Sequence, residues 1–320
     1  MKPRLALTLG DPRGIGPEIA AKALEAPLDA DIILVGAEDQ IAGIPAARRV
    51  PVGTWKSGSG DAGPEHPRSH ARTILAGKIA GHSVESAVRL ALAGEVDGIV
   101  TAPIHKHALH LAGFPFPGHT EWLAHLAGDI DVAMMLAADA LRVVLVTTHV
   151  ALRDVPAMLT VEKVVRTGEV TRKALRDWFG IEHPRLVVCA LNPHAGESGL
   201  FGDEEARILS PAATQLSAAG PLPADTVFVR AMRGEFDAVL TPYHDVGMTA
   251  IKVAAFGRGV NVTLGLPFPR TSPDHGTAFD IAGKGVADWG SMREALEMAV
   301  ALSSRNRGLN KTQLSGPAAR

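Results

Sequence analysis

Short apolar runs rich in β-branched residues alternate with helix-like segments along the chain, and this alternation limits the possible folds most strongly. Val143–Val146 and Leu186–Val188 are continuous apolar runs of the kind found in strands that are buried on both faces, as in parallel sheets. Helix-like segments such as Val161–Trp178 separate them. The alternation predicts an α/β fold with a mostly parallel sheet and right-handed crossover connections.

Three strand-like runs end just before a histidine. The runs and their histidines are Leu141–Val146 with His149, Arg185–Leu191 with His194, and Phe236–Leu240 with His244. Ligands of open α/β sheets bind beyond the carboxyl ends of the strands, and neighbouring strands lie only about 4.8 Å apart. The three imidazoles can therefore converge on one divalent metal that keeps an open position, as catalytic zinc sites do. The spacings match no local zinc motif, and ordinary loop histidines remain the alternative.

The composition excludes several function classes. Asp and Glu number 34 and Lys and Arg 32, so the net charge of −2 gives no field that favours nucleic acid or an anionic membrane. Cys189, the single cysteine, lies inside an apolar run and is expected to be a buried side chain rather than a nucleophile. No apolar stretch approaches the ~20 residues of a membrane span, and no intrachain disulfide is possible, so we expect a cytoplasmic protein.

Two turns offer contacts to a small ligand. Gly10–Glu18 joins the first strand to the first helix, but it has neither Walker A nor GxGxxG spacing, and a tight turn alone explains its glycines. Gly118–Glu121 contains His119 and Thr120, whose imidazole and hydroxyl suit a substrate carboxylate or phosphate. Thr120 equally fits the cap of a helix, and Ser83 is expected to cap another one.

Basic side chains cluster among glycines and prolines between residues 252 and 276. Lys252 lies eight residues beyond His244, and Arg270 follows a Gly- and Pro-containing segment. Cations held in such turns predict an anion pocket, although surface exposure is the usual fate of lysine and arginine. Asp225 follows the turn Pro221–Pro223 and is either a partner of a metal-bound histidine or a helix cap.

Together these stretches resemble the 4-hydroxythreonine-4-phosphate dehydrogenase family of pyridoxal phosphate biosynthesis and its close paralogues. The matching segments run in the family's order from residue 10 to residue 285 and are Gly10–Glu18, Thr101–Lys106, Gly118–Glu121, Thr147–His149, Asn192–Glu197, Pro221–Thr226, Tyr243–Asp245, Phe256–Pro267 and Thr271–Gly276. Asn192–Glu197 and Gly257–Asn261 are the most specific of them. Arg13 in the first turn and Pro273 before Asp274 depart from the family pattern.

The resemblance implies a two-lobed α/β fold similar to isocitrate and isopropylmalate dehydrogenases, with a cleft between the lobes, in a homodimer. We place the lobes at residues 1–125 plus 258–320 and at residues 126–257. The resemblance also implies a divalent metal (Zn²⁺, Mg²⁺ or Co²⁺) whose site is completed across the dimer interface and whose ligands are His149, His194 and His244. The substrate contacts that it implies are made by His119, Thr120, Lys252, Asn261 and Arg270.

The implied reaction is an oxidation of 4-phosphooxy-threonine by NAD or NADP, which gives a 3-keto acid that loses CO₂ to form 3-amino-2-oxopropyl phosphate. A metal would acidify the reacting hydroxyl, and a partly buried Lys252 or, alternatively, Asp225 would carry the proton. Within the family, 4-phospho-threonate, the corresponding erythronate or a cis-dihydrodiol carboxylate are alternative substrates. A metal-dependent hydrolase is the alternative from a different class.

Overall fold

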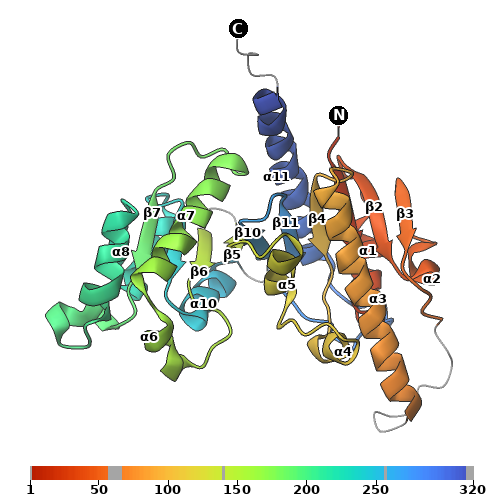
Figure 1. Cartoon of the computed structure of the whole chain (residues 1–320), viewed down its shortest axis with the longest axis horizontal. Helices are drawn as coiled ribbons and strands as arrows, with labels where there is room; N and C mark the ends of the chain where they lie inside the picture. Colours follow the sequence, from red (N-terminus) through yellow and green to blue (C-terminus); the bar gives the residue numbers. More distant parts are fainter. Residues whose placement is uncertain (1, 57–66, 139–140, 256–257, 315–320) are drawn as a thin grey trace. The chain divides into compact units, whose positions relative to one another are not determined.

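In a computed structural model the chain forms two compact α/β units (Figure 1). Unit 1 comprises Met1–Asp129 and Leu266–Arg320, and unit 2 comprises Ile130–Gly265. The structure describes residues 2–56, 67–138, 141–255 and 258–314, so Phe256 and Gly257 of the family segment lie outside the described residues. The sequence-based lobe boundary at residue 258 differs from this division, because Val260–Leu264 pairs with a strand of unit 2.

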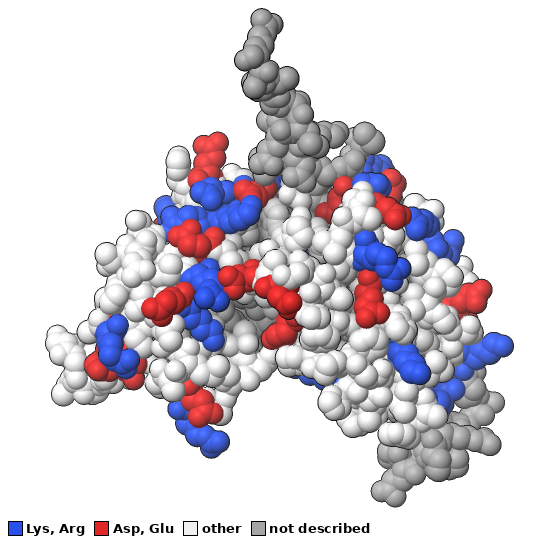
Figure 2. All heavy atoms as spheres, in the orientation of Figure 1, with Lys and Arg blue, Asp and Glu red and all other residues white. Residues whose placement is uncertain are grey.

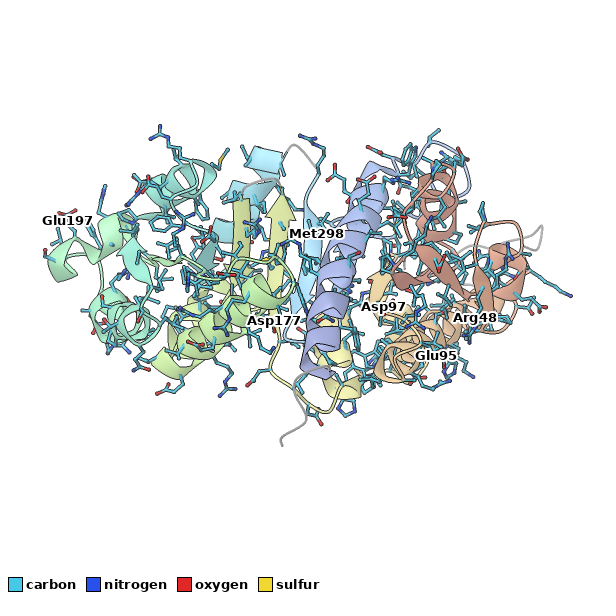
Figure 3. All side chains as sticks on the ribbon, turned by 90° about the horizontal axis from the view of Figure 1, so that it is seen from above. Arg48, Glu95, Asp97, Asp177, Glu197 and Met298 are labelled. Atoms are coloured by element: carbon cyan, nitrogen blue, oxygen red, sulfur yellow. The ribbon has the colours of Figure 1, made fainter. Side chains whose placement is uncertain are left out.

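Unit 1 contains a fully parallel set of strands. Their order is β3 (Arg48–Pro51), β2 (Asp31–Gly36), β1 (Arg4–Thr8), β4 (Gly98–Thr101) and β11 (Arg270–Pro273). The helices are α1 (Gly16–Ala23), α2 (Glu38–Ile41), α3 (Pro67–Leu92), α4 (Lys106–Leu111), α5 (His119–Leu126) and α11 (Gly290–Leu314). The long helix α3 packs against β1, β2 and β4, and α11 packs against β4 and β11. An ion pair of 2.7 Å between Arg48 and Glu95 ties β3 to the segment that follows α3 (Figure 3).

Unit 2 contains a mixed set of strands. Their order is β10 (Val260–Leu264), β5 (Ala133–Ala138), β6 (Leu141–Leu145), β9 (Ala238–Thr241), β7 (Leu186–Cys189) and β8 (Ala219–Leu222). β5 is antiparallel to both of its neighbours, and the other pairings are parallel. The helical segments are η1 (Leu152–Asp154), α6 (Val155–Met158), α7 (Val161–Asp177), η2 (Pro193–Gly199), η3 (Glu205–Leu209), α8 (Ser210–Gln215), α9 (Ala224–Met232) and α10 (His244–Ala255).

The core of unit 2 shows why the apolar runs form its strands. Val143 of β6, Val187 of β7 and Val239 of β9 point to the same face of the sheet. They pack in one cluster with Val227 of α9 and Ile251 of α10. Because successive side chains of a strand point to opposite faces, the intervening apolar residues are buried on the other face of the sheet. The prediction of an α/β fold with mostly parallel strands is therefore confirmed.

The helix cap predicted at Ser83 and the alternative readings of Thr120 and Asp225 as caps are wrong. Ser83 lies inside α3, where its hydroxyl donates to the carbonyl of Ile79 at 2.7 Å, because a serine hydroxyl can bond back to the preceding turn. Gly118, not Thr120, precedes the first residue of α5. Asp225 lies in the first turn of α9 after Pro223, where its negative charge favours the helix amino terminus without capping it.

The surface is mixed in charge, as the balanced composition predicts. Figure 2 shows acidic and basic side chains interspersed over the visible face, without a large patch of one sign. None of the helices in the described part of the chain combines the length and the apolar character that a bilayer crossing requires. Cys189 is buried, and burial raises the pKa of its thiol to about 12, so the expectation that it is not a nucleophile agrees with the structure.

Candidate active site

The strands that precede the three candidate histidines are neighbours in unit 2. β9 lies between β6 and β7, and all three are parallel. Leu145 of β6 is in register with Thr241 of β9, and Val188 of β7 with Leu240 of β9. The strands therefore end at the same edge of the sheet, which is the usual ligand side of an α/β unit.

His149 and His244 lie side by side at this edge. Their ring centres are 5.7 Å apart and their planes are inclined by 43°. Two imidazoles that coordinate one metal at ~2.1 Å have ring centres about 5–6 Å apart, so the spacing matches a shared ion. Nδ1 of His244 lies 2.7 Å from Oδ1 of Asp245 and donates to this carboxylate, so Nε2 is the ring nitrogen that can face a metal. These donors fit a divalent metal, and imidazole nitrogen favours Zn²⁺ or Co²⁺ over Mg²⁺.

His194 begins a left-handed turn. All residues of η2 from His194 to Ser198 have positive φ, between 42° and 83°. Left-handed backbone costs a residue with a Cβ about 1–2 kcal/mol, and only Gly196 escapes this cost. Strain of this kind persists only where neighbouring contacts hold it. His194 is exposed on the turn, as is Glu197, which Figure 3 labels.

Within one chain, His194 does not join the other two histidines. Among residues 2–56, 67–138, 141–255 and 258–314, no three His, Cys, Asp or Glu side chains come close enough to hold a metal. The His194 ring instead lies beside Phe201, with ring centres 6.5 Å apart. A three-histidine site therefore requires movement of the η2 turn or a histidine of a second copy of the chain.

Both candidate proton carriers lie on helices next to this edge. Lys252 is on α10, eight residues after His244, which corresponds to about 12 Å along the helix axis. Asp225 is on α9, which contacts η2. Both side chains are exposed, so unit 2 alone does not provide the burial that was expected for Lys252.

Asn261 has a buried polar atom that is available to a ligand. It lies in β10 opposite Leu136 of β5, and its Oδ1 is buried without a hydrogen-bond partner among the residues that the structure describes. A buried carbonyl oxygen without a partner loses the free energy of a hydrogen bond, so such an atom is a candidate ligand contact.

Unit 1 holds a second group of candidate residues around Arg270. This arginine is only 2% exposed at the start of β11, and its Nη2 donates to the hydroxyl of Thr101 in β4. Burial lowers the pKa of Arg270 to about 9. Nε2 of His119 is buried and has no hydrogen-bond partner in the described part of the chain, and Thr120 follows His119 in the first turn of α5. A bound anion would offset the cost of burying the guanidinium, which fits a phosphate-binding role.

We expect the His119 imidazole to remain neutral between about pH 6 and pH 8. Burial, followed by the positive charges of Arg270 and Lys106, lowers its pKa well below 6.5. Because the charged form of His119 is disfavoured, its imidazole takes up a proton only at lower pH, and His119 should contribute no step near pH 6.5 to the pH dependence of substrate affinity. An NMR titration of the ring nitrogens, assigned with His119→Asn, measures this directly. A His119 midpoint at 6.5 or above would contradict the burial argument.

Two charged groups of the structure were missed by sequence reasoning. Arg13, which was treated as a departure from the family pattern, donates from Nε (3.0 Å) and Nη2 (2.7 Å) to the completely buried carboxylate of Asp11. Its guanidinium also lies over the ring of Phe279 at 5.0 Å. Glu205 is also buried and accepts hydrogen bonds from the segment before η2. In both cases, only the tertiary structure reveals that a charged residue is internal.

Comparison with known proteins gives consistent results over nearly the whole chain. The family model described as pyridoxal phosphate biosynthetic protein PdxA matches residues 60–299. A 4-hydroxythreonine-4-phosphate dehydrogenase of Geobacter metallireducens is 44% identical, covering 94% of this chain and 96% of that protein. A provisionally named D-threonate 4-phosphate dehydrogenase of Bradyrhizobium diazoefficiens is 42% identical, with 94% and 96% covered. The crystal structure of a 4-hydroxythreonine-4-phosphate dehydrogenase from Klebsiella pneumoniae has a TM-score of 0.81 at 37% identity, covering 95% of this chain and 98% of that one.

Proposed function

The chain belongs to the family of the pyridoxal phosphate biosynthetic protein PdxA, and we propose that it is an NAD(P)-dependent 4-hydroxythreonine-4-phosphate dehydrogenase. Its substrate is then a small phosphorylated amino acid with a secondary alcohol. The observation that carries the proposal is the position of three histidines at the carboxyl ends of three neighbouring strands in a member of this family. We also propose that the protein works in the cytoplasm, in pyridoxal phosphate biosynthesis.

We propose that His149, His194 and His244 hold a divalent metal. The ring spacing of His149 and His244 and the carboxylate partner of His244 support this assignment. A bound divalent ion would supply Lewis-acid polarisation of a substrate oxygen.

Arg270, His119 and Thr120 are proposed to bind the phosphate. The buried Arg270 offers a fixed fork that matches two phosphate oxygens, and the neutral His119 adds a hydrogen bond from its ring. Asn261 is proposed to orient the substrate through its buried amide. These contacts would hold the carbon that loses hydride against the nicotinamide, which is the positional part of the rate acceleration.

Lys252 is proposed to take the proton of the reacting hydroxyl, with Asp225 as the alternative base. A lysine carries this proton at neutral pH only when its amine is partly desolvated. A second copy of the chain can provide that burial, because unit 2 exposes apolar side chains beside the site: Val253 next to Lys252 is 69% exposed and Leu200 near His194 is 73% exposed. We therefore propose a homodimer whose interface completes the site.

The second candidate substrate is D-threonate 4-phosphate, after the 42% identical relative. It shares the phosphate and the secondary alcohol but lacks the amino group. A cis-dihydrodiol carboxylate lacks the phosphate, and the buried Arg270 favours the phosphorylated substrates over it.

A substrate panel tests the proposal. The protein is loaded in turn with Zn²⁺, Co²⁺ or Mg²⁺ and given NAD or NADP with 4-phosphooxy-threonine, D-threonate 4-phosphate or unphosphorylated 4-hydroxythreonine. We expect reduced nicotinamide to form with a kcat/KM for 4-phosphooxy-threonine at least about tenfold above that of the others, a difference of ~1.4 kcal/mol in transition-state free energy. A higher kcat/KM for D-threonate 4-phosphate would assign the paralogue's activity. Phosphate release without nicotinamide reduction would indicate a hydrolase.

A further inference from the structure

The turn that carries His194 is anchored by a buried carboxylate that has no place in the chemistry proposed above. Oε1 of Glu205 accepts hydrogen bonds from the backbone amides of Leu191 at 2.8 Å and Asn192 at 2.7 Å. Oε2 accepts one from Nδ2 of Asn192 at 2.9 Å. Glu205 itself is only 5% exposed. One side chain thus binds two of the three residues between β7 and η2.

The same carboxylate also lies under the middle of the turn. A Cβ placed on Gly196 would lie 3.0 Å from Oε2 of Glu205, so the backbone of η2 passes directly over this oxygen. Gly196 has a φ of 83° and is the buried residue of η2, whereas His194 is exposed. Glu205 therefore contacts the buried side of the turn, whereas His194 lies on its exposed side.

We propose that Glu205 is a positioning residue that fixes the backbone from Leu191 to Gly196 and thereby sets the direction of the His194 ring. The role of His194 as a metal ligand rests on the proposed function, whereas the anchoring of the turn does not. A left-handed run of residues with Cβ atoms has no local preference for its conformation, so it needs an external anchor. Glu205 supplies an acceptor for the backbone amides of the half-buried Leu191 and Asn192.

Two substitutions of Glu205 remove its hydrogen-bond acceptors in part or completely. Glu205→Gln keeps an oxygen for the two backbone amides, but its NH₂ would face Nδ2 of Asn192, which is a donor as well. Asn192 cannot resolve this by rotating its amide, because its Nδ2 also donates to Oε2 of Glu204 at 2.8 Å. Glu205→Ala removes all of the acceptors. Asp203→Asn is the matched control. It removes one negative charge two residues before Glu205, from an exposed carboxylate that pairs with the exposed Arg207.

The test measures the anchoring and the metal site separately on the full chain. Amide hydrogen exchange of residues 191–199 is recorded in metal-free protein, and Co²⁺ and Zn²⁺ affinities are recorded by calorimetry and by the Co²⁺ absorption spectrum. We expect amide exchange in this segment to become faster from the wild type to Glu205→Gln and again to Glu205→Ala. Metal affinity should weaken in the same order, by about 10- to 100-fold, and Asp203→Asn should change neither quantity. Thermal unfolding shows that each variant is folded at the temperature of the assay.

Each outcome has a distinct meaning. Unchanged exchange at residues 191–199 in folded Glu205→Gln and Glu205→Ala overturns the anchoring role. Faster exchange with wild-type metal affinity overturns the link between this anchor and the direction of His194. If His194→Ala binds Co²⁺ as tightly as the wild type, the metal assignment in the proposed function fails, while the exchange data still decide the anchoring role on their own.

Discussion

His244→Ala is expected to abolish metal binding and to lower kcat/KM about 10³-fold or more, a loss of at least ~4 kcal/mol of transition-state stabilisation. His244 lies at the centre of the proposed site, because β9 separates the strands that lead to His149 and His194. A carboxylate also orients its ring, since Nδ1 of His244 lies 2.7 Å from Oδ1 of Asp245. His149→Ala and His194→Ala should have effects of similar size, and the effects should not add, since any one of them destroys the site.

The matched control is His183→Ala. His183 is an exposed histidine of unit 2 that lies just before β7, at the strand end opposite to the one that leads to His194. This variant should bind metal and turn over as the wild type does. Metal content after dialysis, affinity by calorimetry and steady-state kinetics are compared for all four variants, and circular dichroism verifies that each is folded. Full metal stoichiometry in His244→Ala would disprove the three-histidine assignment.

The three strands that precede the histidines could be predicted, because a strand that is buried on both faces has a continuous apolar sequence. Runs such as Val143–Val146 have no polar positions, which only a strand covered on both sides tolerates. Each run ends at polar residues that mark the carboxyl end of the strand. The comparisons confirm the family resemblance. That resemblance implied that these strand ends carry the metal ligands, which stays a prediction.

The left-handed turn at His194 could not be predicted, because no local propensity favours it. His194, Ala195, Glu197 and Ser198 all have positive φ although none is glycine. The contacts that hold this backbone come from Glu205, which in the sequence is an ordinary acidic residue of a helix-like segment. A tertiary contact determines the local conformation here, and a pattern of single residues does not record tertiary contacts.

Charged residues account for most of the other differences between the sequence-based expectations and the structure. Nothing in the turn Gly10–Glu18 marks Asp11 as internal, yet its carboxylate is fully buried and accepts two hydrogen bonds from the guanidinium of Arg13. Lys252 was expected to be partly buried and is exposed in the single chain. Burial of an ion depends on its partner, and the partner of a charge is set by the fold rather than by its neighbours in sequence.

Arg270→Met is expected to raise the KM for the phosphorylated substrate about 100-fold, since a charge-assisted fork to phosphate contributes ~2–3 kcal/mol. The fold should tolerate the change. Arg270 is 2% exposed and burial already disfavours its charged form, so an unbranched apolar side chain of similar length removes a desolvation cost while it fills the same space. Loss of the hydrogen bond to Thr101 partly offsets this gain.

Two comparisons distinguish phosphate binding from a structural role of Arg270. Arg270→Lys keeps the charge without the fork and should give a smaller rise in KM, about tenfold, because lysine offers a point charge only. Thr101→Val removes the hydroxyl that Arg270 contacts and leaves the guanidinium in place, so it should change KM far less than Arg270→Met does. Unphosphorylated 4-hydroxythreonine reports whatever part of the effect is independent of phosphate. If Arg270→Met weakened this substrate and the phosphorylated one equally, Arg270 would support the structure of β11 and β4, and the phosphate would have to be bound elsewhere in the chain.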